Sequence, residues 1–328
     1  MCVCLMCRIV SAMLLCPLSS TNATPFAVSV VTSHCRRPRN LLRVVDLRQR
    51  SVAVNFSVCV PPMFGEFDAV QDLVEFVEVN RVLGAQRFQL YVSSVGARVS
   101  RCLHEYVSRD VVQLQAWTLP PDVSRIIYYH GQILAISECL YRLMHRTRYV
   151  VVQDLDEFVV PMQSDDWQSM LDAINRNART DSDRIASYNF RNRFFPTEFP
   201  PKASNSTSAL ADSGDGRRFR TLSVVKADKK LFRFTERSKV MARPERVLMY
   251  HVHLILSSSL VRAGDVNVNA NARYGQLFHY RRGFRVANTT TVSRMKDFER
   301  LILRRLYVAT AAICLTGDYL YPPDDVAR

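Results

Sequence analysis

The sequence of 328 residues predicts an α/β fold with a doubly wound, Rossmann-like first half and a second half of different organisation. Apolar runs of strand length alternate with segments of helical periodicity between residues 52 and 152. Residues 149–152 (Tyr-Val-Val-Val) form a continuous apolar run, as in strands buried on both faces of a parallel sheet. Hydrophobic residues make up 48% and charged residues 23%, which is ordinary for a globular chain with a sizeable core.

The first half contains the clearest elements. Residues 52–60 are β-branched and apolar and end at a pair of prolines, which predicts a strand. Residues 67–83 carry apolar residues at helical spacing, and Gly84 suits the position just past a helix. The elements expected next are the strand 88–92, the short helix 99–106, the strand 111–117, the helix 132–145 and the strand 149–152.

The second half lacks this regular alternation. Ser164 is expected to cap a helix that starts near Trp167. Residues 201–216 are rich in Ser, Asn, Asp and Gly and predict a loop, whereas 222–234 and 247–256 read as strands.

Four segments are expected along the chain. Residues 1–18 are apolar except for Arg8 and predict a signal peptide or signal-anchor, the alternative being an extension without a targeting role. Residues 19–50 are polar and Arg-rich and suggest a stem. The folded domain is expected over 51–300, followed by a C-terminal helix and tail over 301–328.

Cysteines and glycosylation sequons bear on the compartment. The nine cysteines show no recurring zinc-ribbon spacing, and their pairing cannot be deduced from the sequence. Asn-x-Ser/Thr sequons begin at Asn22, Asn55, Asn205 and Asn288, which favours passage through a secretory lumen. Asn205 is the best candidate because it lies in the polar loop.

The charge balance favours anionic partners. Lys plus Arg is 44 and Asp plus Glu is 30, a net charge of +14. Such a surplus suits nucleic acid, anionic lipid or phosphorylated substrates. The basic residues are scattered, and neither a zinc-finger spacing nor an RNP-like sequence occurs, so no nucleic-acid partner is expected.

Two carboxylates directly follow the apolar run 149–152. Alternation along a strand would point Asp154 and Asp156 to one side and Leu155 to the other. The carboxyl edge of a parallel sheet is where ligands bind. Mn²⁺ or Mg²⁺ between these carboxylates would bridge a diphosphate and neutralise it as a sugar–phosphate bond breaks. Glu157 follows at once and could add charge or hold the loop.

A second Asp-x-Asp pattern, Asp181 and Asp183, lies in a polar stretch beside Arg179 and Arg184. No buried strand precedes it, so a solvated turn is expected there.

An ordered set of motifs carries a family resemblance. It comprises Tyr129-His-Gly-Gln, Glu138-Cys-Leu-Tyr-Arg, Asp154-Leu-Asp-Glu-Phe, Pro161, Arg237-Ser-Lys-Val, His253 and His279-Tyr-Arg. In this order they resemble glycosyltransferase family 92 over roughly residues 52–300. Glu138 departs from the Asn-Asp pair more usual in that family, which puts a donor contact from that helix in doubt.

The resemblance implies a GT-A fold, in which a Rossmann-type nucleotide-binding half with a mixed central sheet is joined to an acceptor-side half. It implies a metal-dependent, inverting transfer of galactose from UDP-galactose to a glycan acceptor on a glycoprotein or glycolipid. The expected location is the Golgi or secretory lumen, with a single-pass anchor at the N-terminus if residues 1–18 are retained.

The resemblance also selects further site residues. His253 is expected to be a metal ligand or a diphosphate contact, the alternative being a hydrogen-bonded core histidine. Lys239 and Arg281 are expected to hold phosphate oxygens, although surface exposure explains them nearly as well. Trp117 could stack on a sugar, but an anchoring role in the core or a loop is preferred.

An inverting transfer needs a carboxylate base. Asp183, Glu198 and Asp228 are available in the second half. Glu198 is taken as the candidate catalytic base because it follows the aromatic segment Phe194-Phe195, where an acceptor could dock.

Two other functions stay open. A catalytically inactive glycan-binding protein that retains the fold is the main alternative, motivated by Glu138 and the weak leader. A nucleic-acid-binding protein rests only on the charge of +14, and the sequons argue against it.

Overall fold

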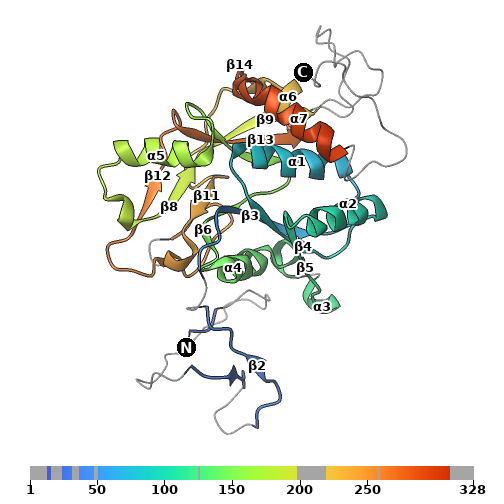
Figure 1. Cartoon of the computed structure of the whole chain (residues 1–328), viewed down its shortest axis with the longest axis vertical. Coiled ribbons are helices and arrows are strands. Elements are labelled where there is room, and N and C mark those ends of the chain that lie inside the picture. Colours follow the sequence, from blue (N-terminus) through green and yellow to red (C-terminus); the bar gives the residue numbers. More distant parts are fainter. Residues whose placement is uncertain are drawn as a thin grey trace.

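The computed structural model describes residues 13–15, 24–31, 37–47, 51–124, 126–197, 219–256 and 259–310. A layered body begins near residue 51, and a small hairpin of β1 (Ala27–Val28) and β2 (Leu42–Arg43) lies outside it (Figure 1). Most of the expected signal segment 1–18 and the sequon at Asn205 lie outside the described residues. Within those ranges, no helix combines the length and apolar character needed to cross a bilayer.

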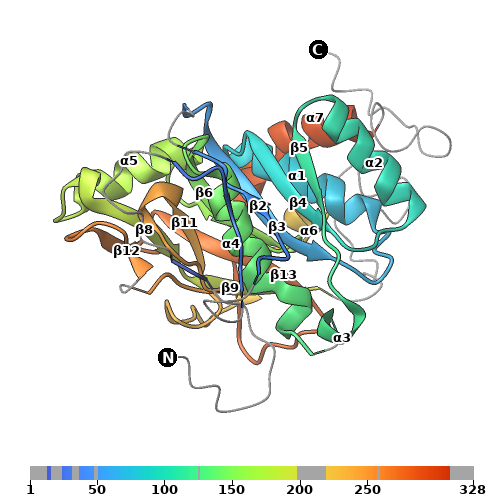
Figure 2. The ribbon, with the colours of Figure 1, turned by 90° about the horizontal axis from the view of Figure 1, so that it is seen from below.

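Four parallel strands in the spatial order β6-β3-β4-β5 form one half of a seven-stranded sheet. Figure 2 shows this sheet from below, with α4 on the near side and α1 beyond it. The predicted α/β class and Rossmann-like first half are confirmed. The elements of this half are β3 (Val54–Met63), α1 (Val70–Leu83), β4 (Arg87–Val92), α2 (Ala97–Ser108), β5 (Val112–Ala116), α3 (Pro121–Ser124), η1 (Tyr128–Gly131), α4 (Gln132–Leu143) and β6 (Thr147–Val152).

The strand β6 is buried on both faces, as its apolar run predicts. Val151 packs in the larger core cluster together with α1, whereas Val150 and Val152 pack on the opposite face with α4. On that second face Cys59 of β3 is disulfide-bonded to Cys139 of α4. The sheet therefore has apolar side chains on both sides, each covered by helices.

The second half extends the sheet and adds another. β11 pairs antiparallel with both β6 and β8, and β12 pairs parallel with β8, which makes the central sheet mixed. A separate three-stranded sheet has the order β7-β13-β9. Its elements and those that complete the half are β7 (Glu157–Pro161), α5 (Trp167–Asn177), η2 (Ser182–Arg184), β8 (Ile185–Phe190), β9 (Asn192–Thr197), α6 (Arg220–Ser223), β10 (Lys226–Asp228), β11 (Lys239–Ala242), η4 (Pro244–Arg246), β12 (Val266–Asn269), β13 (Gly275–Arg282), β14 (Thr289–Thr291), η6 (Arg294–Phe298) and α7 (Glu299–Ala309).

Three expectations for this half are wrong. Residues 222–234 are not one strand, because the short helix α6 and the three-residue β10 occupy their start. Residues 247–256 form no strand beyond an isolated bridge at Val247. The cap of α5 is Asp166 rather than Ser164, since the Asp166 carboxylate accepts a hydrogen bond from the Ser169 N–H at 2.8 Å.

Candidate functional site

The site lies where the strand order reverses. β3 leads into α1 on one face of the sheet, whereas β6 is reached from α4 on the other face. Neighbouring parallel strands whose connections lie on opposite faces leave a crevice at their carboxyl ends. The segment that follows β6 therefore enters the position where α/β proteins bind nucleotides.

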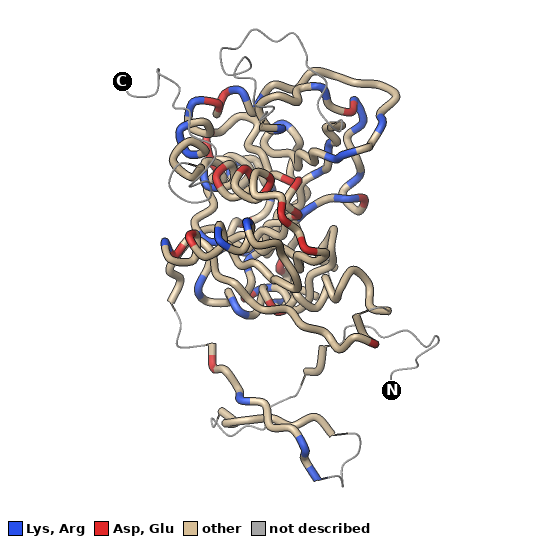
Figure 3. The backbone as a smooth tube through the Cα atoms, turned by 90° about the vertical axis from the view of Figure 1, so that its right-hand side faces the viewer, with Lys and Arg blue, Asp and Glu red and all other residues tan. Residues whose placement is uncertain are grey.

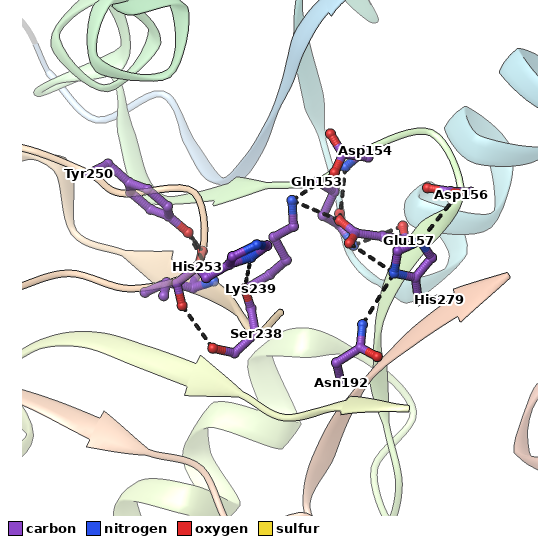
Figure 4. Close-up of polar contacts among 11 residues, drawn as sticks. Gln153, Asp154, Asp156, Glu157, Asn192, Ser238, Lys239, Tyr250, His253 and His279 are labelled. Carbon is purple, nitrogen blue, oxygen red and sulfur yellow. Dashed lines mark hydrogen bonds and ion pairs between the residues drawn. The ribbon is translucent and has the colours of Figure 1, made fainter. Parts of the chain in front are cut away.

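This segment is a tight turn. β6 ends at Val152 and β7 begins at Glu157, whose N–H donates to the Asp154 carbonyl at 3.0 Å. The turn, rather than strand alternation, places Asp154 and Asp156, and both line a cleft of about 720 Å³. Leu155 also borders this cleft, while its side chain packs against the larger core cluster. Figure 4 shows the two aspartates on either side of the turn, each near a different basic partner.

Lys239 of β11 lies beneath Asp154. Its ammonium is 2.9 Å from the Asp154 Oδ2 and 2.9 Å from the Glu157 Oε2, and its side chain is fully buried. Burial acts to lower the pKa of Lys239, but the two carboxylates raise it, so the ammonium stays charged. Lys239 therefore holds the turn from below and is not among the residues that line the cleft.

Glu157 is the centre of this network. Its side chain is 2% exposed, and its Oε2 accepts a hydrogen bond from the Asp154 N–H at 3.1 Å. Its Oε1 is 3.3 Å from the His279 Nδ1. Burial raises the pKa of Glu157 to about 7. Glu157 thus connects Lys239, the turn and β13.

His279 brings β13 to the second aspartate. Its Nε2 is 3.2 Å from the Asp156 Oδ2. Burial acts to lower the pKa of His279, but Glu157 and Asp156 raise it overall. Burial acts to raise the pKa of Asp156, but the hydrogen bond and charge of His279 lower it overall. Asp156 is therefore ionised at neutral pH.

The carboxylates of the turn suit a hard divalent cation that arrives with a diphosphate. Across the described ranges, no group of three or more His, Cys, Asp or Glu side chains is placed to hold a metal ion. The side chains of Asp154 and Asp156 remain 39% and 35% exposed, and both line the cleft. Mg²⁺ and Mn²⁺ can bind through one or two carboxylates when substrate phosphates and water complete the shell. These two residues fit that arrangement.

His253 also lines the cleft, as expected from the sequence. Its Nδ1 lies 3.2 Å from the Ser238 carbonyl, so the ring donates there and keeps its lone pair on Nε2. Burial, followed by the charge of Lys239, lowers the pKa of His253. A neutral ring with a free Nε2 can bind a metal or accept a hydrogen bond.

Four arginines line the cleft: Arg220, Arg237, Arg281 and Arg282. Arg220 and Arg282 both pair with Asp72 of α1. Arg281 has no carboxylate partner among the described residues, and Arg237 lies over the Phe194 ring at 5.6 Å. The guanidiniums of Arg237 and Arg281 are therefore the ones available to an anionic ligand.

The structure describes two of the three candidate bases, and neither of these two lines the cleft. Glu198 lies outside the described residues. Asp183 belongs to η2, where Asp181 accepts from its N–H at 2.9 Å in an exposed turn, as expected. Asp228 lies in β10 and accepts from the Lys230 N–H. Neither aspartate lines the cleft.

Several cleft features have no local signal in the sequence. Arg220 donates to the Leu155 carbonyl at 2.7 Å and lies 3.4 Å from both Asp72 and Glu75. These partners come from distant segments, so spacing alone cannot find them.

Trp117 anchors a loop, because its indole N–H donates to the His130 carbonyl at 2.8 Å.

The family model of glycosyltransferase family 92 matches residues 54–304. The chain belongs to glycosyltransferase family 92. The match runs from the first strand of the body into α7. The family 92 assignment therefore covers both halves of the cleft.

A curated relative is beta-1,4-galactosyltransferase galt-1 of Caenorhabditis elegans, which is 32% identical over 108 residues. The alignment spans 32% of this chain and only 25% of that protein.

Two bacterial proteins of known structure show a distant structural similarity to this chain. One is TarS 1-349 of S. aureus, with 9% identity, a TM-score of 0.30 and coverage of 80% of this chain and 66% of that chain. The other is glucosyl-3-phosphoglycerate synthase of Mycobacterium tuberculosis, with 13% identity, a TM-score of 0.33 and coverage of 80% and 81%. Likeness of this degree says nothing about substrate.

Proposed function

We propose that this protein is a metal-dependent glycosyltransferase that transfers galactose from UDP-galactose to a glycan acceptor with inversion. The observation that carries the proposal is the cleft of a family 92 chain in which Asp154 and Asp156 face basic side chains. The name of the C. elegans relative supports galactose as the sugar.

The donor's diphosphate would lie between the turn and the basic side chains. Asp154 and Asp156 would hold Mn²⁺ or Mg²⁺, with the Nε2 of His253 as a further candidate ligand. The ion, when bound, neutralises charge that develops on the departing diphosphate. Arg281 and Arg237 would contact phosphate oxygens, for which the guanidinium fork is suited. Lys239 pairs with Asp154 and His279 with Asp156, which holds both carboxylates in place.

In the transfer, the acceptor oxygen forms a bond to the anomeric carbon while the bond from that carbon to the β-phosphate oxygen breaks. The bonding electron pair leaves with UDP, and the hydroxyl proton passes to a carboxylate base. Glu198 remains the candidate for that base, as an expectation from the sequence alone.

We also propose a location in the Golgi or secretory lumen. The disulfide between Cys59 and Cys139, and the disulfide-bonded state of Cys102, support an oxidising compartment. Residues 1–18 would serve as the signal or membrane anchor.

A screen of UDP-sugars with purified protein tests the function. We expect Mn²⁺-dependent UDP release with UDP-galactose and a glycan acceptor. Asp156→Ala should lower the rate at least about a hundredfold, because it removes a carboxylate that would hold the ion that neutralises the departing diphosphate. Asp183→Ala, in the exposed second Asp-x-Asp pattern, is the matched control and should keep its activity.

No turnover of any UDP-sugar with metal present would end the proposal. Glycan binding without turnover would instead favour a catalytically inactive glycan-binding protein.

A further inference from the structure

Two exposed tyrosines line the cleft together with the aspartate turn. Tyr128 and Tyr129 are 60% and 61% exposed, and their ring centroids are 4.7 Å apart with the ring planes tilted by 52°. Large aromatic side chains that stay in solvent beside a cleft are common at binding sites, because they offer a flat apolar surface. Neither ring contributes to the buried core.

The backbone under these rings is held in an unfavourable conformation. Tyr129 and His130 have positive φ values of 42° and 52°, followed by Gly131 at 75°. Such values are uncommon for residues with a Cβ and persist where the surroundings impose them. Here the Trp117 indole donates to the His130 carbonyl at 2.8 Å, and the Phe64 ring stacks on His130 at 3.9 Å. These contacts hold the loop in the conformation that places both tyrosine side chains at the cleft.

Gln132 adds a polar group beside the rings. It is the first residue of α4, lines the same cleft and is only 7% exposed. Its side-chain amide makes no hydrogen bond to any residue that the structure describes. A carboxamide presents one acceptor and two donors side by side. An almost buried, unpartnered amide at a cleft wall points to a ligand with a complementary edge.

The position of the loop indicates which part of a ligand would lie there. The loop follows β5, whose carboxyl end lies on the same edge of the sheet as those of β3 and β6. Arg237 and Arg281, the side chains proposed to contact phosphate, come from the second half of the chain. A nucleotide with its diphosphate at the turn would extend its base toward the Rossmann-like half.

Resting on the proposed function, we propose that Tyr128 and Tyr129 form the stacking platform for the base of the donor nucleotide, one ring lying on the face of the base and the tilted second ring bordering it, with Gln132 hydrogen-bonded to its edge. A nucleobase is flat and has adjacent donor and acceptor groups, which matches the rings and the amide. A pyranose can also stack on an aromatic ring, but the Gln132 carboxamide can pair two groups at once with the donor–acceptor edge of a base.

Calorimetric titration of UDP and of inorganic pyrophosphate, both with Mn²⁺, separates base from phosphate contacts. We expect Tyr128→Ala with Tyr129→Ala to weaken UDP binding at least about tenfold, as loss of base stacking does elsewhere. Pyrophosphate binding should stay unchanged. Tyr129→Phe should retain UDP binding because it keeps the ring.

Two further variants sharpen the test. Gln132→Leu should weaken binding of UDP but not of pyrophosphate. Ile126→Ala is the matched control, because Ile126 is 55% exposed in the same loop and does not line the cleft. Its binding of both ligands should equal that of the unmodified protein.

The outcomes distinguish this inference from the proposed function. Unchanged UDP binding in the double variant, or equal loss of UDP and pyrophosphate, overturns the stacking platform while the transferase proposal stands. If the unmodified protein binds neither UDP nor pyrophosphate, the proposed function itself fails and this inference fails with it.

Discussion

Buried charges around the turn are placed so that each has a partner of opposite sign. The sequence predicts that a cation must separate Asp154 and Asp156, since carboxylates beside a buried strand repel each other. The structure supplies part of that charge from the protein itself, because Lys239 pairs with Asp154 and His279 with Asp156. The turn can therefore hold its shape without a ligand, and the proposed divalent ion would add to this arrangement rather than create it.

Glu75 gives a residue-scale prediction for the dependence of stability on pH. Its Oε1 accepts from the N–H and hydroxyl of Thr221 at 2.8 and 2.7 Å. Burial raises the pKa of Glu75 above its ordinary value of 4.5, although the charge of Arg220 opposes this. A raised folded-state pKa contributes stability below about pH 4.5, and that contribution is lost as the pH rises through the folded-state value.

We therefore expect the free energy of unfolding of the protein, relative to Glu75→Gln, to fall as the pH rises above the ordinary glutamate pKa of 4.5 and through the raised folded-state pKa. Gln keeps the acceptor oxygen but does not titrate. Urea unfolding at several pH values measures this difference. Glu105→Gln, on the exposed side of α2, is the control. A difference that stays flat or rises with pH would contradict the assignment.

At the scale of elements, the sequence predicts a strand correctly when the strand's own residues show a distinctive apolar pattern. The run 149–152 predicts β6 because a strand buried on both faces must be apolar throughout. The segment 247–256 looks similar but is not a strand. Its apolar residues Val247, Tyr250 and Ile255 are buried from a loop, and the Tyr250 hydroxyl donates to the Val240 carbonyl of β11. Strand formation needs a neighbouring strand, which the sequence does not show.

The same limit applies to the site. Asp154 and Asp156 can be found because they directly follow a recognisable strand. The partners Lys239 and His279 come from β11 and β13, so the sequence can name them by resemblance but cannot place them beneath the turn. The salt bridges from Arg220 to Asp72 and Glu75 carry no local pattern at all.

The disulfide between β3 and α4 gives an element-scale prediction. It joins Cys59 to Cys139 across 80 residues, inside the smaller core cluster. Replacing both residues with Ala removes this cross-link from the unfolded chain and should lower the free energy of unfolding by about 2–5 kcal/mol. Thermal and urea unfolding of the double variant measure the loss. An unchanged midpoint would show that the cross-link does not stabilise the domain.

At the scale of the whole molecule, the cleft depends on both halves of the chain. The aspartate turn and the tyrosine loop come from the Rossmann-like half, whereas His253, His279 and Arg281 come from the second half. Lys and Arg positions are interspersed with Asp and Glu through the described body (Figure 3). In the described residues the basic side chains are thus widely distributed, and only a few of them line the cleft.

If the metal ion takes some of its ligands from the protein and the rest from the nucleotide, the two should bind cooperatively. Because no cluster of three metal-binding side chains occurs in the parts of the chain described, the protein alone offers Mn²⁺ an incomplete shell. UDP would supply the missing oxygens, so each ligand should raise the affinity for the other by the same factor, at least about fivefold.

Calorimetric titrations of UDP with and without Mn²⁺, and of Mn²⁺ with and without UDP, measure this coupling. Asp156→Ala should abolish it, whereas Asp183→Ala should leave it intact, because Asp156 lines the cleft and Asp183 does not. Equal UDP affinity in Mn²⁺ and in a chelator would mean that the protein's own cations bind the diphosphate alone. In that case the cleft arginines Arg237 and Arg281, rather than a metal held by the aspartates, would neutralise the leaving group.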